Sequence, residues 1–235
     1  MLTTIQRVFA PVKRLTPRWF WSPLRRVATA FFAPALFSWR EGHFRSSVRA
    51  ASVDRHGEPL PWYTYPSIDF LRVRDFSRRR VLEFGAGQST LWWAPRVASL
   101  VSIEEDRSWA EKLRPRLPAH AEVHLASMVS AEACLADVGR ILEGRGLFDV
   151  IVIDGLYRRE LVPVAVRALA EAGMIICDNS EGYGFREEFL RHAMSRVDFY
   201  GMVPGVILDH CTSIYFRSDA FAFEASQPIV DKYRS

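Results

Sequence analysis

Polar side chains recur in this sequence directly after apolar runs, where parallel strands would end. They are Glu83, Glu104, Asp154 and Asp178, with Asn179 beside the last. In an open α/β sheet, ligands bind outside the carboxyl ends of the strands. Carboxylates gathered there can bind a cationic ligand, hold a divalent metal, or accept a proton from a substrate. The sequence therefore predicts one polar site that is built from several strand ends.

A glycine turn lies between the first of these strands and a helix. The stretch that begins at Glu83 is Glu-Phe-Gly-Ala-Gly-Gln-Ser-Thr-Leu. Gly85 and Gly87 would let a ligand approach the backbone closely, and a helix that starts at about Ser89 offers free N–H groups. Glu104 follows about 20 residues after the turn, where an acidic side chain can accept hydrogen bonds from both ribose hydroxyls. The pattern predicts a nucleoside-bearing cofactor.

Two features of the turn discriminate between nucleoside cofactors. A dinucleotide fingerprint has a third glycine where this sequence has Thr90, and the Glu83 carboxylate would repel a pyrophosphate. The same carboxylate would attract a cationic amino-acid group. Together with Glu104, the pattern resembles that of the class I S-adenosylmethionine (SAM) methyltransferases. The third glycine often seen in that family is Ser89 here.

The resemblance implies a role for each residue of the turn. Glu83 would lie near the methionine ammonium, directly or through water, and Glu104 would hold the ribose. Gly85 and Gly87 would line the methionine and the ribose. The implied cofactor-binding residues are, in full, Glu83, Gly85, Ala86, Gly87, Ser89, Glu104 and Asp154, with Thr64 and Tyr65 from an upstream segment.

That upstream segment is Pro-Trp-Tyr-Thr-Tyr-Pro over residues 61–66. It resembles the Pro-Trp-x-Thr-Tyr-Pro segment that precedes the glycine turn in a bacterial group of uncharacterised class I methyltransferases. The resemblance implies that the segment folds over the cofactor pocket, with Thr64 and Tyr65 as contacts to SAM or to the substrate. The alternative is an aromatic plug that covers the edge of the sheet.

The acids after the later strands also resemble a metal centre. Asp154, Asp178 and Asn179 are similar to the ligands of the metal-dependent catechol-type O-methyltransferases, in which a divalent cation gathers the substrate's hydroxyl oxygens. Oxygen ligands of this kind suit Mg²⁺ or Ca²⁺. Family members without a metal carry the same residues, so a role in shaping the pocket stays open. Candidate catalytic bases are Asp154, Asp178, His43 and His210.

Apolar runs alternate with amphipathic segments through most of the chain. Strands are predicted near residues 80–84, 98–103, 121–125, 148–153 and 174–177, followed by a helix near 185–197 and two strands near 199–203 and 213–216. The resemblance implies that these last two are the antiparallel pair that closes the family's sheet. Such alternation predicts a doubly wound, Rossmann-like α/β fold, and the resemblance implies a seven-stranded sheet. We expect this domain to span residues 56–235.

Residues 1–55 differ from the rest in charge. The chain carries a formal charge of +4, yet residues 1–40 contain seven Arg or Lys and no Asp or Glu. Their longest uncharged run, residues 27–39, is too short to span a bilayer, which takes about 20 helical residues. We expect a helical extension that packs on the body or a partner protein, lies on an anionic membrane surface, or targets an organelle. No module for specific nucleic-acid binding follows it.

Length and composition complete the expectation. With 235 residues, 49% of them apolar, the chain can bury one substantial core. Three scattered cysteines argue against a disulfide framework and favour a reducing, cytoplasmic setting, with peripheral contact at the inner face of the membrane as an option.

The predicted function is SAM-dependent methyl transfer to a small-molecule or glycan-like acceptor, at oxygen. One alternative is a non-catalytic protein of the same fold that docks to a membrane or to a partner enzyme. The other is an NAD-type oxidoreductase, against which Glu83 and the missing third glycine count.

Overall fold

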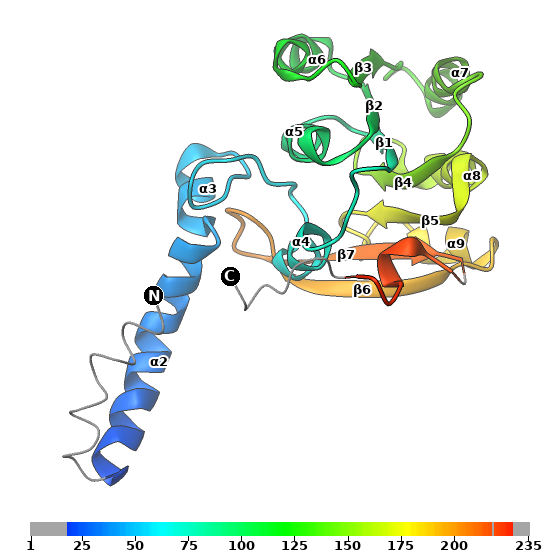
Figure 1. Cartoon of the computed structure of the whole chain (residues 1–235). Helices are drawn as coiled ribbons and strands as arrows, with labels where there is room; N and C mark the ends of the chain where they lie inside the picture. The colour runs from blue at the N-terminus through cyan, green and yellow to red at the C-terminus, as the bar shows by residue number, and fades with distance from the viewer. Residues whose placement is uncertain (1–17, 218, 228–235) are drawn as a thin grey trace.

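A computed structural model describes residues 18–217 and 219–227 of the chain. Within these residues, seven strands form one mixed sheet (Figure 1). The strands are β1 (Arg80–Phe84), β2 (Ser99–Glu104), β3 (Ala121–Leu125), β4 (Phe148–Ile153), β5 (Leu169–Cys177), β6 (Ser195–Met202) and β7 (Asp209–Phe216). Their order across the sheet is β3-β2-β1-β4-β5-β7-β6, and β7 runs antiparallel to both of its neighbours. The predicted Rossmann-like, seven-stranded α/β fold is confirmed.

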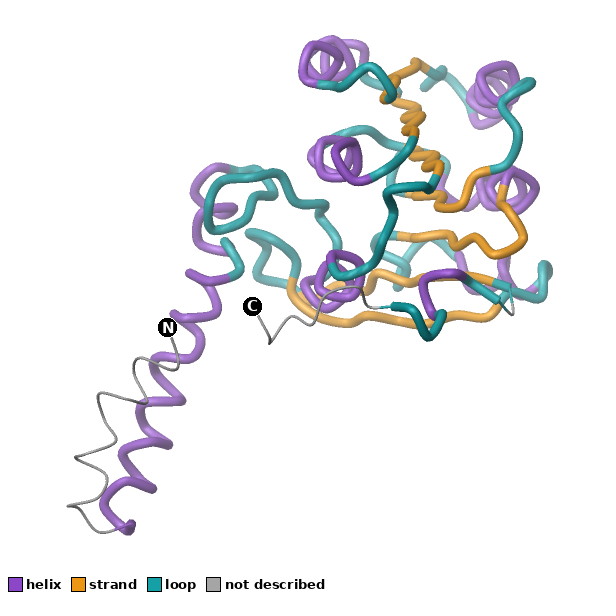
Figure 2. The backbone as a smooth tube through the Cα atoms, in the orientation of Figure 1, coloured by secondary structure: helices purple, strands orange, loops and turns teal. Residues whose placement is uncertain are grey.

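Helices cover both faces of the sheet, as Figures 1 and 2 show. They are α2 (Arg18–Arg40), α3 (His43–Arg49), α4 (Tyr65–Arg72), α5 (Gln88–Trp93), α6 (Arg107–Leu113), α7 (Ala131–Leu142), α8 (Arg158–Ala168) and α9 (Phe185–Leu190), with short 3₁₀ turns at Ala94–Arg96, Arg114–Arg116 and Phe221–Phe223. Helices α4 and α5 pack on one face, and α7, α8 and α9 pack on the other. The sheet is therefore covered on both sides.

The buried core divides into two clusters, one on each face. Val150 and Val152 of β4 belong to the cluster under α4 and α5, whereas Ile151 and Ile153 belong to the cluster under α7 and α8. All four side chains are completely buried. Successive side chains of a strand point to opposite faces, so a strand that is covered on both faces needs an unbroken apolar sequence. This is the physical reason why β4 was predictable from its sequence.

Two sequence predictions of element boundaries are wrong. The helix predicted for residues 185–197 ends at Leu190, and β6 begins at Ser195. Ala193, between them, has a positive φ of 50°, which an α-helix cannot continue through. Beyond it, residues 195–202 pair along their whole length with β7. The fifth strand begins at Leu169, before the point predicted, because pairing with β4 starts there.

The N-terminal extension contains α2 and α3. Helix α2 runs away from the sheet in both views of the chain (Figures 1 and 2), and α3 follows it after a short turn. The part of the predicted extension that precedes residue 18 lies outside the described residues. Among the described residues, no helix combines the length and the apolar character needed to cross a membrane.

Candidate functional site

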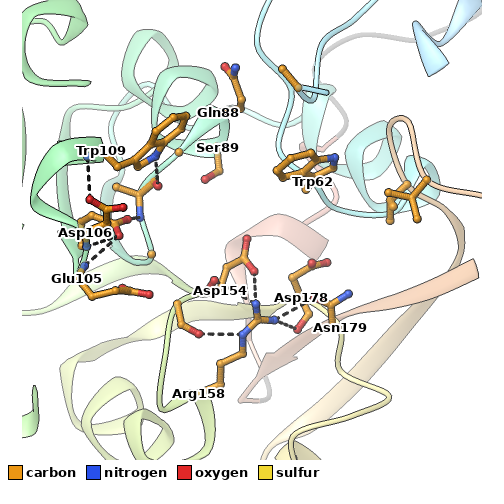
Figure 3. Close-up of a pocket in the computed structure, with 18 of the residues that line it drawn as sticks. Trp62, Gln88, Ser89, Glu105, Asp106, Trp109, Asp154, Arg158, Asp178 and Asn179 are labelled. Atoms are coloured by element: carbon orange, nitrogen blue, oxygen red, sulfur yellow. Dashed lines mark hydrogen bonds and ion pairs between the residues drawn. The ribbon is translucent and has the colours of Figure 1, made fainter. Parts of the chain in front are cut away.

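A cleft of about 530 Å³ lies at the carboxyl ends of β1, β2, β4 and β5. Its lining comes from the residues that follow these strands, from the start of α6, and from the loop between β6 and β7. Figure 3 shows Trp109 and Trp62 on opposite sides of the cleft, with the group around Arg158 between and below them. The volume is in the range of small-molecule sites. Of the predicted strand-end residues, Glu104, Asp154, Asp178 and Asn179 line this cleft, and Glu83 does not.

The two glycines of the turn serve different purposes. Gly85 has a φ of 92°, and a Cβ added there would lie 2.7 Å from the backbone nitrogen of Gly155. It is therefore required for the close packing of the turns after β1 and β4. Gly87 has an extended backbone, and a Cβ there would meet only the indole nitrogen of Trp109, at 3.8 Å. Because Gly87 lines the cleft, its missing side chain leaves room for a ligand.

Glu104 joins the glycine turn to the turn after β2. Its Oε2 accepts a hydrogen bond from the Ala86 N–H (2.7 Å), and its Oε1 accepts from the N–H groups of Glu105 (3.0 Å) and Asp106 (2.9 Å). The side chain is buried yet lines the cleft. A carboxylate has about four lone-pair sites and the chain occupies three of them, so one is left for a ligand hydroxyl. The ribose contact stays a prediction, and Glu104 stands where such a contact can be made.

Glu83 is fully buried and does not line the cleft. Its Oε2 accepts hydrogen bonds from the hydroxyls of Thr90 (2.5 Å) and Ser102 (2.7 Å), and the Thr90 hydroxyl accepts from the Gly87 N–H (2.8 Å). Its Oε1 has no hydrogen-bond partner among the described residues. Burial raises the pKa of Glu83 to about 7, although hydrogen bonds from the hydroxyls oppose this rise. Glu83 thus holds the turn through Thr90, the residue that replaces a dinucleotide fingerprint's third glycine.

Trp109 is a cleft residue that the sequence predictions missed. It lies in the first turn of α6, where Asp106 caps the helix by accepting from the N–H groups of Ser108 (2.8 Å) and Trp109 (3.2 Å). The indole N–H donates to the Ala86 carbonyl (2.8 Å), which fixes the ring beside the glycine turn (Figure 3). Its side chain is 39% exposed. An exposed, oriented aromatic ring in a cleft is suited to stacking on a nucleobase.

Arg158, at the start of α8, was also missed. Its guanidinium donates to the Gly155 carbonyl (3.0 Å), to the Asp154 carbonyl (3.1 Å) and carboxylate (2.8 Å), to the Asp178 carbonyl (2.8 Å), and to Asn179 Oδ1 (3.1 Å). These contacts involve all three nitrogens of the guanidinium. Figure 3 shows the guanidinium between Asp154, Asp178 and Asn179. Arg158 therefore fastens the residues after β4 to those after β5.

This arrangement bears on the predicted metal centre of Asp154, Asp178 and Asn179. The three residues already surround a cation of the protein's own, because Arg158 binds the Asp154 carboxylate and the Asn179 amide oxygen. A divalent ion on the same oxygens would lie beside a full positive charge. The predicted metal ligands do not fit a metal in this arrangement.

Acidic groups dominate the electrostatics of the cleft. Five carboxyl side chains line it, those of Glu104, Glu105, Asp106, Asp154 and Asp178, against the single guanidinium of Arg158 among the described lining residues. Burial raises the pKa of Asp154 to about 6, and Arg158 opposes this rise. Burial and the neighbouring Asp154 raise the pKa of Asp178 well above its ordinary value. A cationic ligand would relieve this crowding of negative charge.

The opposite wall of the cleft is more apolar. It includes Trp62, Val203 and Val206, and the Trp62 indole N–H donates to the Pro204 carbonyl (2.8 Å). His210 lines the cleft at the start of β7. Its Nδ1 lies 2.9 Å from a Glu181 carboxylate oxygen and 3.1 Å from the Asn179 amide nitrogen. These contacts engage Nδ1, so Nε2 is the ring nitrogen left for a ligand.

Thr64 and Tyr65, the predicted contacts from the proline-rich segment, are buried and do not line the cleft. The Thr64 N–H donates to the Thr212 hydroxyl (2.9 Å), which in turn donates to the Asp178 carboxylate (3.0 Å). The Tyr65 ring packs edge-on against Phe37, with the ring centroids 5.3 Å apart. Trp62 is thus the residue of this segment that lines the cleft. Thr64 is connected to Asp178 through the Thr212 hydroxyl. The predicted contacts of Thr64 and Tyr65 with the cofactor stay predictions.

The sequence matches no protein-family model and no curated protein. Among solved structures, a methyltransferase from Pyrococcus furiosus is 17% identical, with a TM-score of 0.46 over 80% of this chain and 98% of its own. The N-methyltransferase NodS from Bradyrhizobium japonicum is 18% identical, with a TM-score of 0.45 over 64% and 93%. A methyltransferase-like protein from Silicibacter pomeroyi is 18% identical, with a TM-score of 0.47 over 69% and 91%.

At these identities and scores, the likeness carries no conclusion about activity. The strand order itself is informative, because the last strand in the sequence, β7, lies between β5 and β6 and runs against both. This is the antiparallel closure that the resemblance implied. The chain therefore has the Rossmann-like, seven-stranded sheet with the strand arrangement that the resemblance implied.

Proposed function

We propose that this protein transfers a methyl group from SAM to an oxygen of a small-molecule acceptor. The observation that carries the proposal is the charge of the cleft. Its lining has five carboxyl groups, and its one described guanidinium, that of Arg158, is fully engaged by the protein. SAM brings a sulfonium and an ammonium group, which this surface attracts. NAD brings two phosphates, which it repels.

The cleft offers a partner for each part of SAM. Glu104 can accept from a ribose hydroxyl, and Gly87 leaves its own side-chain space open to the nucleoside. Trp109 is placed to stack on the adenine, because its indole N–H holds it beside the turn. The acidic group of Asp154 and Asp178 then faces the methionine part. This assignment follows the resemblance for Glu104 and Gly87 and adds Trp109 from the geometry.

Methyl transfer demands alignment and a destination for one proton. An acceptor hydroxyl oxygen attacks the methyl carbon in line with the carbon–sulfur bond. The electron pair of that bond goes to sulfur, so the sulfonium becomes the neutral thioether of S-adenosylhomocysteine as the carbon–oxygen bond forms. His210 Nε2 takes the hydroxyl proton, and Glu181 stabilises the imidazolium from the Nδ1 side. Asp178 is the second candidate base, while Asp154 is held by Arg158.

The acceptor side favours a molecule with a flat apolar face. Trp62, Val203 and Val206 form that wall, and the Trp62 ring is fixed by its bond to Pro204. An aromatic ring or the apolar face of a sugar ring can pack on an indole of this kind. The wall thus suits an acceptor that carries its hydroxyl on an aromatic ring or on a sugar ring. A glycan-like acceptor belongs to the second kind.

Two substitutions test the proposal. Glu104→Ala removes the predicted ribose acceptor, whereas Glu104→Gln keeps one carbonyl oxygen in place. We expect calorimetry with S-adenosylhomocysteine to show at least a tenfold loss of affinity for Glu104→Ala and a smaller loss for Glu104→Gln. Thermal unfolding must show that both variants are folded. Unchanged affinity in a folded Glu104→Ala protein would refute the ribose contact.

The base is tested separately with His210→Gln. This variant should bind S-adenosylhomocysteine within about threefold of wild type, because His210 lies on the acceptor side of the cleft. Production of S-adenosylhomocysteine from SAM, measured with a panel of phenols and sugar alcohols, should fall by about 100-fold or more for any acceptor that the wild type methylates. A His210→Gln enzyme with wild-type turnover would assign the proton to Asp178 instead.

A further inference from the structure

Helices α2 and α3 carry a surface that methyl transfer does not use. Large apolar side chains stand out into solvent along both helices, although such residues are normally covered. They are Val27, Phe31, Phe32, Leu36, Trp39, Phe44 and Val48, and Phe31 is 75% exposed. Figure 1 shows α2 running away from the sheet, so the body does not cover most of its length. We call these residues, together with Arg45, Arg49 and Arg55, the α2–α3 surface.

A second cavity, of about 250 Å³, lies within the α2–α3 surface. Its lining combines three arginines, Arg45, Arg49 and Arg55, with the apolar side chains of Trp39, Phe44 and Val48. No carboxylate is among its described lining residues. None of the ion pairs found in the described part of the chain involves these three arginines. The cavity therefore joins uncompensated positive charge to an apolar wall.

Two of these guanidinium groups converge on one point. A Cβ added at Gly57 would lie 3.0 Å from Nη1 of Arg49 and 3.4 Å from Nη1 of Arg45. Gly57 itself has a φ of 92° and closes a turn after Arg55. Like charges that are held together without an acidic partner repel each other, so an anion at this point would be stabilising. Phosphate is an anion that arginine donors match well.

We propose that the α2–α3 surface docks on an anionic phospholipid bilayer, with a lipid phosphate in the cavity of Arg45, Arg49 and Arg55. The exposed aromatic and aliphatic side chains of α2 would then enter the boundary between headgroups and acyl chains. Arg25 and Arg26 at one end of the uncharged run and Arg40 at the other would remain among the headgroups. The helix lies on the membrane in this arrangement and does not cross it.

Charge and apolar area together favour lipid over other occupants. Residues 18–57 contain seven arginines and only two acids, so a second copy of the same surface would place arginines against arginines. A nucleic acid would satisfy the arginines but would leave the uncharged run of residues 27–39 uncovered. A bilayer with anionic headgroups satisfies both the charge and the apolar side chains.

Sedimentation of the full-length chain with vesicles tests the proposal. One vesicle preparation contains only phosphatidylcholine, and the other contains phosphatidylcholine and phosphatidylglycerol at a ratio of about three to one. We expect binding to the anionic vesicles to be at least tenfold tighter. The double variant Arg45→Gln/Arg49→Gln should lose roughly tenfold to thirtyfold of that affinity, and Phe31→Ser/Phe32→Ser should lose a similar amount. A matched charge control, Arg116→Gln/Arg186→Gln, removes two exposed arginines elsewhere and should stay within about twofold of wild type.

Binding measurements with inorganic phosphate and with duplex DNA distinguish a lipid from a free anion or a nucleic acid. Thermal unfolding confirms that each variant is folded, and this control does not depend on SAM binding. Equal affinity for both vesicle types, or equal losses in the two arginine pairs, would overturn the proposal. Tighter binding to inorganic phosphate alone, or to duplex DNA, than to the anionic vesicles would also overturn it, because the ligand would then be a free anion or a nucleic acid.

Discussion

The cleft and the α2–α3 surface use arginine in opposite ways. In the cleft, all three guanidinium nitrogens of Arg158 contact protein oxygens after β4 and β5. On the α2–α3 surface, Arg45 and Arg49 take part in none of the ion pairs of the described residues, and their guanidinium groups meet at Gly57. A guanidinium with every donor engaged holds the protein together. One with free donors is available to a ligand.

Two buried carboxylates, one of them outside the cleft, show that position matters as well. Glu83 and Glu104 both accept hydrogen bonds from the chain, but only Glu104 lines the cleft. Glu83 also keeps an Oε1 without a hydrogen-bond partner among the described residues, so the position of a carboxylate relative to the cleft decides whether a ligand can reach it. Four predictions sharpen this contrast between structural and ligand-facing groups.

The largest expected effect is on stability, from Arg158→Ala. This change leaves the largely buried Asp154 without its ion-pair partner, which typically costs about 3 to 5 kcal/mol. Arg159→Ala is the matched control, because the side chain of Arg159 is 52% exposed and its Nε lies 3.8 Å from Oε2 of Glu188. That change should cost less than about 1 kcal/mol. Urea unfolding measures both, and equal losses would contradict the structural role of Arg158.

The next effect separates the two glycines. Gly85→Ala puts a methyl group 2.7 Å from the Gly155 nitrogen at a φ of 92°, and should destabilise the fold by about 2 to 4 kcal/mol. Gly87→Ala meets no such obstacle and should unfold within a few degrees of wild type, while its affinity for S-adenosylhomocysteine falls by at least about tenfold. A Gly87→Ala protein that unfolds much earlier, or binds normally, would show that the turn is not open to a ligand.

A third effect concerns the pH dependence of stability. The pKa of Glu83 is raised to about 7 in the folded protein from an ordinary value of 4.5, so the folded state binds the extra proton between these values. The free energy of unfolding therefore falls as pH rises from about 4.5 to about 7, by roughly 3 kcal/mol from this group. Glu83→Gln should remove that contribution. We expect the variant to gain stability relative to wild type at pH 8, and not at pH 4.

Comparing urea unfolding of wild type and Glu83→Gln at the two pH values isolates Glu83, because the other titrating groups are common to both proteins. If the free energy of unfolding of the two proteins depended on pH in the same way, the ionisation of Glu83 would not destabilise the folded protein. The substitution also keeps an acceptor for Thr90 and Ser102, so the hydroxyl contacts need not be lost.

The smallest effect is on the affinity for SAM. The pKa of Asp154 is raised to about 6 and that of Asp178 lies well above its ordinary value, so both bind a cation better once they are ionised. We expect the affinity for SAM to rise by about threefold to tenfold between pH 5.5 and pH 7.5, with protons released on binding. Calorimetry in two buffers of different ionisation enthalpy detects that release. An affinity that falls with pH would contradict a cationic ligand at these acids.

Much of the fold could be predicted from the sequence. The central strands are buried on both faces, so they appear as apolar runs. The runs of β2, β4 and β5 lead to acids that line the cleft, whereas Glu83 in β1 is buried away from it. Glu104 and Gly87 were predicted from their local spacing, and both line the cleft. The helix predicted beyond Leu190 was wrong, because pairing with β7 decides the conformation of residues 195–202.

The rest of the site depends on contacts that sequence spacing does not reveal. Arg158 lies four residues after Asp154, but its bonds to Asp178 and Asn179 need two strands side by side. The same holds for Trp62, whose place is fixed by Pro204 from the loop between β6 and β7. The spacing of four residues between Asp154 and Arg158 was the one available signal, because it permits an ion pair where a helix begins.

The central claim is that the acidic cleft selects a cationic nucleoside cofactor. Calorimetric titration of the full-length protein with SAM, S-adenosylhomocysteine and NAD, each with and without Mg²⁺, tests it most directly. We predict micromolar binding of both adenosyl ligands, no measurable binding of NAD, and no change with Mg²⁺. Binding of NAD in preference to SAM, or failure of all three ligands to bind the folded protein, would contradict the claim.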